Sequence, residues 1–113
     1  MLLKIRLLTL LRERRIPLDI NLTSNLALQI YSDLSQHPFQ RLEDSGLILT
    51  INTDDPALFN TTLNREFELL EEVFEYTRSD IIRIARNSFM VCGATPDLKQ
   101  ILLSKFDKWE SDL

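Results

Sequence analysis

Two adjacent carboxylates, Asp54 and Asp55, are the residues of this chain best suited to chemistry. They lie in the stretch Asn-Thr-Asp-Asp-Pro, residues 52–56, directly after the apolar run of residues 47–51. Such a run is typical of a parallel strand that is covered on both faces. The carboxyl ends of parallel strands are where α/β folds place their reacting groups. Here a carboxylate can bind a metal ion or contact a substrate.

Each aspartate also has a purely structural interpretation. Asp54 or Asp55 can cap the amino terminus of a helix or form an Asx turn before Pro56. Adjacent side chains on an extended backbone point to opposite sides, so the two carboxylates are not expected to do the same job. Spacing alone leaves the structural and the chemical interpretations open.

The first half of the chain predicts the elements that position these carboxylates. Leucines at helical spacing indicate a helix over residues 2–14, which Pro17 ends. Alternating apolar residues over 18–22 predict a short strand, and Thr-Ser-Asn at 23–25 predicts a polar turn at its carboxyl end.

A second helix and strand complete a βαβ unit. Pro38 favours the start of a helix over residues 39–45, and Gly46 favours its end in a left-handed cap. The strand over residues 47–51 follows at once. Two parallel strands alone leave unpaired edges and uncovered faces, so the pattern predicts that a partner surface is missing.

After Pro56 the chain is predicted to be helical throughout. Thr77 with Asp80 resembles a capping box, and Thr95 followed by proline and aspartate is a strong helix start. Three apolar stripes at helical spacing are expected to belong to the core: Leu63, Phe67, Leu70 and Phe74; Ile81, Ile84, Ala85 and Phe89; Leu98, Ile101, Leu102, Phe106 and Trp109.

Composition excludes several classes of function. The chain has 113 residues, 44% of them hydrophobic, and a net charge of −4, which disfavours binding to a nucleic-acid backbone. The single cysteine, Cys92, excludes an internal disulfide and suits a reducing cytoplasm. Lys4 and Arg6 interrupt the apolar amino terminus, which is also too short to span a membrane. We expect a cytoplasmic protein without a membrane partner.

Most of the chain resembles the adenosine and adenine deaminases, a family of metal-dependent hydrolases. Residues 46–59 and 62–70 are similar to the last barrel strand of that family and the segment that follows it. Further similarity lies at residues 10–18, at Thr-Ser-Asn 23–25, at His37 with Pro38, and towards the carboxyl terminus at residues 85–87 and 106–109.

The resemblance implies both a fold and a site. Residues 1–113 would form the carboxyl-terminal part of a (β/α)8 TIM-type barrel, with about two parallel strands, followed by carboxyl-terminal helices. Asp54 would be a zinc ligand and Asp55 would contact N7 of a purine ring. Thr23, Ser24 and Asn25 would lie beside the metal as support. In the family, zinc activates the water that attacks C6 of adenine.

Much of the family's site has no counterpart here. His37 is the only histidine and precedes an outer helix, where a structural hydrogen bond or a solvated side chain is expected. The family's zinc histidines, its proton-shuttling glutamate and its water-orienting histidine are therefore missing. Asn21 and Leu22 also replace a frequent Cys-Pro pair. A catalytic zinc needs about three protein ligands, so the chain alone is expected neither to hold zinc nor to catalyse.

Three interpretations follow from this shortfall. In the first, the chain is a fragment truncated upstream of Met1, as an uncapped first helix suggests. In the second, it is one half of a split enzyme that another polypeptide completes. In the third, it is a non-catalytic interaction module. The parent reaction would convert adenosine, or a related purine, to inosine and ammonia; residues 64–70 favour adenosine. An isolated chain is expected to self-associate through its open strand edges.

Overall fold

A computed structural model describes residues 2–113. The first half of the chain forms four helices and two short strands: α1 (Leu2–Glu13), β1 (Leu18–Ile20), α2 (Leu22–Ala27), the 3-10 helix η1 (Leu34–Gln36), α3 (Phe39–Asp44) and β2 (Leu49–Ile51). The second half is helical: α4 (Pro56–Phe59), α5 (Leu63–Phe74), α6 (Arg78–Val91) and α7 (Pro96–Ser111). Within residues 2–113, no helix has the length and apolar character needed to cross a membrane.

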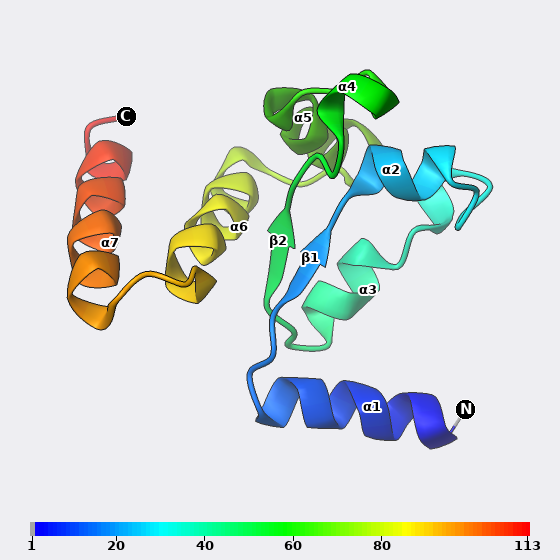
Figure 1. The fold of residues 1–113 in the computed structure, drawn as a ribbon, viewed down its shortest axis with the longest axis horizontal. Coiled ribbons are helices and arrows are strands. Elements are labelled where there is room, and N and C mark those ends of the chain that lie inside the picture. Colours follow the sequence, from blue (N-terminus) through cyan, green and yellow to red (C-terminus); the bar gives the residue numbers. More distant parts are fainter. Residues whose placement is uncertain (1) are drawn as a thin grey trace.

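The two strands form a parallel pair, with Leu18 opposite Leu49 and Ile20 opposite Ile51. The helix α3 lies between them in the chain, so the predicted βαβ unit is confirmed. Figure 1 shows α2 and α4 beyond the carboxyl ends of β1 and β2, at the same end of the sheet. The two strand exits are therefore close together, as a parallel pair requires.

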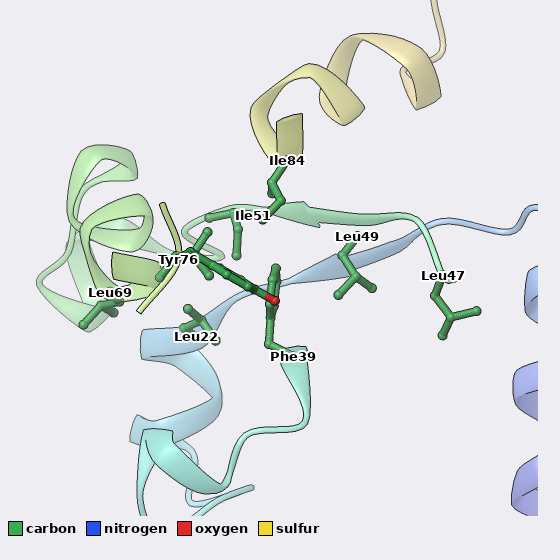
Figure 2. Packing of buried hydrophobic residues seen from close by; sticks show 9 residues of the cluster. Leu22, Phe39, Leu47, Leu49, Ile51, Leu69, Tyr76 and Ile84 are labelled. Atoms are coloured by element: carbon green, nitrogen blue, oxygen red, sulfur yellow. The ribbon is translucent and has the colours of Figure 1, made fainter. Parts of the chain in front are cut away.

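The core packs around β2. Phe39 from α3 is fully buried beneath Leu49 and Ile51, and Ile84 from α6 approaches β2 from its other side (Figure 2). The ring of Tyr76 packs edge-on against Phe39, with 5.9 Å between the ring centroids. Helices from both halves of the chain thus bury the same strand, which explains its near-continuous apolar sequence.

The outer edge of β2 is partly covered. On β1, the N–H of Leu18 donates to the carbonyl of Ile48, and the carbonyl of Ile20 accepts from the N–H of Asn52. Because successive carbonyls along a strand point in opposite directions, the carbonyl of Leu49 faces away from β1. The side-chain amide of Asn87, on α6, donates to that carbonyl at 2.9 Å. A second strand that approaches this edge meets an acceptor already in use.

The predicted helix boundaries are confirmed to within one residue, whereas both strands are shorter than predicted, and β2 begins at Leu49 rather than at residue 47. The first helix ends at Glu13, the helix before Gly46 ends at Asp44, and Gly46 adopts the expected positive φ of 88°. The strand predicted over residues 18–22 ends at Ile20, and Thr-Ser-Asn 23–25 lies within α2 rather than in a turn. Leu22 continues the apolar alternation because it is buried from the first turn of a helix, not from a strand.

Both predicted caps in the second half are confirmed. Thr77 and Asp80 form a reciprocal capping box at the start of α6, and Thr95 Oγ1 accepts from the N–H of Leu98 at the start of α7. These caps depend on residues three positions apart, so the local sequence determines them.

The predicted burial of α7 is wrong. Leu98, Ile101 and Trp109 remain 46%, 53% and 50% exposed, and no residue of α7 is buried. Figure 1 shows α7 on the far side of α6 from the strands. The exposed fractions show that α6 covers only part of the apolar face of α7. Leu63, at the start of α5, is likewise 46% exposed although its stripe was predicted to lie in the core.

Candidate functional site

The two aspartates lie in a turn between β2 and α4. Asp55 is the N-cap of α4, and its Oδ1 accepts from the N–H of Leu58 at 3.0 Å. Pro56 occupies the first turn of that helix. The structural interpretation of Asp55 as a helix cap is therefore confirmed, and its side chain remains exposed to solvent.

Asp54 has a different partner. Its Oδ2 accepts a hydrogen bond from Ser24 Oγ at 2.8 Å. Ser24 is 1% exposed, whereas Asp54 is exposed, so a buried hydroxyl anchors a carboxylate that solvent can reach. Asp54 has a left-handed backbone with φ of 58°, which aspartate tolerates better than most residues. The expected extended backbone is absent at this residue, but the two carboxylates still have different partners.

The amino terminus of α2, which carries Ser24, is held by a residue that the sequence did not single out. The N–H of Thr23 donates to both carboxylate oxygens of Glu66, at 3.3 and 3.4 Å, and Thr23 Oγ1 donates to Oε2 at 3.1 Å. Glu66 lies on α5 and is fully buried. Burial raises the pKa of Glu66, and the hydrogen bonds from Thr23 act in the opposite direction.

His37 has the structural role that was predicted for it. Its Nδ1 accepts from the N–H of Phe39 at 3.2 Å, so the ring proton of the neutral form lies on Nε2, which is 2.9 Å from Asn25 Oδ1. The side chain is buried, and this burial lowers the pKa of His37. Asn25 is thus occupied with His37, and among Thr23, Ser24 and Asn25 it is Ser24 that touches Asp54.

A polar cluster links the two strands on the face opposite to Leu49 and Ile51, at the pair formed by Asp19 and Thr50. Asp19 Oδ1 accepts from Thr50 Oγ1 at 2.8 Å and from Asn52 Nδ2 at 2.6 Å. Asn52 is the residue that leaves β2 towards the two aspartates. The alternation of residues along β1 could have indicated Asp19, since it places an acid on the face opposite Leu18 and Ile20.

The residues of this chain do not by themselves fit a zinc ion. Within residues 2–113 there is no group of three or more His, Cys, Asp or Glu side chains placed to hold a metal. Asp54 stands alone as an exposed carboxylate with one oxygen anchored, whereas a catalytic zinc needs about three protein ligands. At most, this edge supplies one ligand to a larger site.

Comparison with known proteins matches this arrangement to one family. The model of the adenosine deaminase family matches residues 4–109. The chain belongs to the adenosine deaminase family. An adenine deaminase of Psychrobacter cryohalolentis is 34% identical over 98 residues, which are 87% of this chain and 30% of that relative.

Solved structures of deaminases agree with the fold. The adenine deaminase of Arthrobacter aurescens superposes with a TM-score of 0.85 at 29% identity, covering 92% of this chain and 32% of that protein. The N6-methyl-AMP deaminase of Arabidopsis thaliana also gives 0.85, at 30% identity, covering 93% of this chain and 31% of that protein.

The match identifies a segment of the family's fold. The chain spans about 30% of the length of the relative and solved structures that it matches, and the match lies in the carboxyl-terminal part. The predicted fold class is confirmed: a helix-rich α/β segment with two parallel strands, similar to the TIM-barrel structures of deaminases. The family acts on purines by hydrolysing C–N bonds.

Proposed function

We propose that this chain supplies the carboxyl-terminal edge of a zinc-dependent purine deaminase site. In this proposal Asp54 is a zinc ligand and Asp55 contacts N7 of the purine, while other ligands come from the remainder of the barrel. One observation carries it: at the end of β2, two adjacent carboxylates have separate partners, Ser24 Oγ and the N–H of Leu58. The reaction is hydrolytic deamination of adenosine, or a close purine relative, to inosine and ammonia.

The surroundings of Asp54 suit a metal ligand. Ligating carboxylates are usually held by a second hydrogen bond that fixes their orientation. The 2.8 Å bond from Ser24 holds Oδ2 of Asp54, and the exposure of the residue leaves the carboxylate accessible to an ion. Ser24 thus orients the ligand in the proposed site.

The position of Asp55 suits a substrate contact. Its Oδ1 is committed to the amino terminus of α4, which fixes the direction of the carboxyl group. N7 of a purine is a hydrogen-bond acceptor, so contact with a carboxyl group requires a shared proton between Asp55 and the ring. Asp55 therefore distinguishes the bound purine from a ring that lacks this nitrogen.

Residues 2–113 by themselves leave the proposed ligand set incomplete. Within residues 2–113 no further strand pairs with the outer edge of β1 or of β2, and these residues offer one candidate zinc ligand. We propose that a polypeptide with the amino-terminal barrel strands completes both the sheet and the site. The competing interpretation is that the chain is a non-catalytic interaction module. It predicts that Asp54→Ala leaves the binding function of the chain unchanged.

A segment exchange tests the proposal. Residues 4–109 replace the matching carboxyl-terminal segment of the Psychrobacter adenine deaminase, and ammonia release is measured with adenosine and with adenine. We expect turnover with at least one of them, and loss of turnover with Asp54→Ala or with Asp55→Ala. Asp97→Ala, at an exposed aspartate on α7, is the matched control. Turnover that survives both site substitutions would contradict the proposed roles.

The complementation itself needs a separate assay. The full chain is mixed with a polypeptide that carries the amino-terminal barrel strands of the same deaminase, in the presence of zinc. Ammonia release that requires both chains supports a split enzyme. Absence of release at every mixing ratio, together with turnover in the segment exchange, would restrict the proposal to a fragment that acts only within a continuous chain.

A further inference from the structure

Glu66 is a buried acid that the proposed function leaves without a role. It is 0% exposed on α5, on the helix face that also presents Leu70 to the core. A carboxylate at such a position costs free energy unless hydrogen-bond donors compensate it. Thr23 supplies these donors from α2, 43 residues away in the sequence, through its N–H and its hydroxyl.

The partner of Glu66 is the amino terminus of a helix. The first N–H groups of a helix have no acceptor within it, and they usually bond to the side chain of the N-cap residue. Asn21 is the N-cap of α2, but its side chain makes no such bond. Glu66 supplies the acceptor instead, and its negative charge suits the positive end of the helix dipole. The cap of α2 therefore comes from α5.

The capped turn is the one that holds Asp54. Thr23 and Ser24 are consecutive residues in the first turn of α2, and Ser24 Oγ donates to Asp54 Oδ2 at 2.8 Å. Fixing the backbone of Thr23 fixes the position of its neighbour. A continuous path thus leads from Glu66 through α2 to the carboxylate at the end of β2.

We propose that Glu66 is a positioning residue that keeps Ser24 on Asp54 and so orients the proposed zinc ligand. The significance of this orientation rests on the function proposed above, whereas the path of contacts does not. The hydrogen bonds of Glu66 go to Thr23 and not to Asp54, so Glu66 acts through the first turn of α2.

Nuclear magnetic resonance of the full chain tests the path without zinc or substrate. Glu66→Leu removes both acceptors at similar size, and Glu66→Gln keeps one acceptor and adds a donor that can bond Thr23 Oγ1. We expect Glu66→Leu to shift the amide signals of Ser24 and Asp54 and to lower hydrogen-exchange protection of the Thr23 N–H about tenfold or more, which is the loss of one hydrogen bond of about 1.4 kcal/mol. In Glu66→Gln, the amide signals of Ser24 and Asp54 and the protection of the Thr23 N–H are expected to stay close to those of the unchanged chain.

Two further variants separate positioning from general destabilisation. Glu71→Leu, at an exposed acid on the same helix, is expected to leave the Asp54 signal unchanged. Adding Glu66→Leu to Ser24→Ala is expected to move the Asp54 signal no further than Ser24→Ala alone, because both changes act on one path. An unchanged Asp54 signal in Glu66→Leu, or additive shifts in the double variant, would overturn the inference.

A variant that fails to fold does not remove the test. If Glu66→Leu is unfolded, Thr23→Val replaces it, since valine removes the hydroxyl donor and keeps the N–H. We expect a smaller shift of the Asp54 signal in the same direction as in Ser24→Ala. No shift in Thr23→Val would then overturn the inference.

Zinc affinity in the segment exchange links the path to function. Loss of a residue that orients a metal ligand typically weakens binding about 10- to 100-fold, and we expect Glu66→Leu to weaken zinc binding by about tenfold. If Asp54→Ala leaves zinc binding unchanged while the NMR result is as expected, the proposed function fails and the positioning path stands. If Asp54→Ala abolishes binding and Glu66→Leu does not affect it, the positioning inference fails alone.

Discussion

Helices α5 and α7 both carry apolar stripes, yet only α5 is buried. In α5, Leu70 and even the acid Glu66 are fully enclosed, whereas every residue of α7 keeps some exposure. The difference comes from what lies opposite each helix. α5 packs on four elements, α6, α2, β2 and η1, whereas α7 packs mainly on α6. An apolar stripe shows which face a helix can bury, and the neighbouring elements determine whether it does.

The first prediction tests whether stability resides in the layer around β2. Phe39→Ala removes the fully buried ring beneath the strands and is expected to lower the free energy of unfolding by about 3–5 kcal/mol. Phe106→Ala, on the half-buried face of α7, is expected to cost much less. Urea unfolding followed by circular dichroism measures both. Equal losses would show that α7 is as much a part of the core as α3.

Helix caps sharpen the same comparison. Thr77→Ala removes the capping box of α6, which packs on β2, and is expected to lower the free energy of global unfolding by about 1 kcal/mol. Thr95→Ala removes the equivalent cap of α7 and is expected to fray that helix with a smaller global effect. Amide hydrogen exchange distinguishes the two, because fraying affects only the amides of α7. Global loss of protection in Thr95→Ala would contradict the comparison.

Because His37 is buried, the stability of the folded chain is predicted to depend on pH. Burial lowers the pKa of His37 in the folded chain, so the unfolded chain binds its proton first on acidification. The contribution of His37 to stability is therefore complete above its ordinary pKa of 6.5 and falls as the pH drops below that value. Denaturant midpoints from pH 8 to pH 5 measure the fall. A His37→Gln chain is expected to lack this part of the slope, and an identical slope would refute it.

The smallest effect is expected on the surface of α7. Arg86 and Asp107 form an exposed ion pair at 2.8 Å between α6 and α7. Exposed pairs contribute little because solvent screens them, so Asp107→Asn is expected to leave the thermal midpoint unchanged within error. A clear drop in the midpoint would show that this pair, rather than packing, holds α7 in place.

Local signals in the sequence predicted local structure well. The caps at Thr77 and Thr95 and the left-handed Gly46 were all predicted, because each depends on neighbouring residues. Asp54 and Asp55 were found at the end of a strand by the same kind of reasoning. The resemblance to the deaminases then indicated different roles for the two carboxylates.

Contacts between distant residues were not predictable in this way. The strand predicted over residues 18–22 extends two residues too far, because Leu22 is buried by packing against residues that follow later in the chain rather than by a place in the strand. The acceptor for the N–H of Thr23 comes from Glu66, whereas the neighbouring sequence offers only Asn21 as a cap. An acid on the apolar face of α5 is the one sequence signal that could have indicated it, since acids are rarely buried without a partner.

The zinc content of the exchanged deaminase tests the central claim most directly. After removal of free metal, the enzyme that carries residues 4–109 is analysed with Asp54→Ala and, separately, with Asp55→Ala. We predict that zinc is lost with Asp54→Ala and retained with Asp55→Ala, because in the proposed site Asp54 binds the metal and Asp55 contacts the purine. Equal zinc content in the two variants would contradict the division of roles between these adjacent residues.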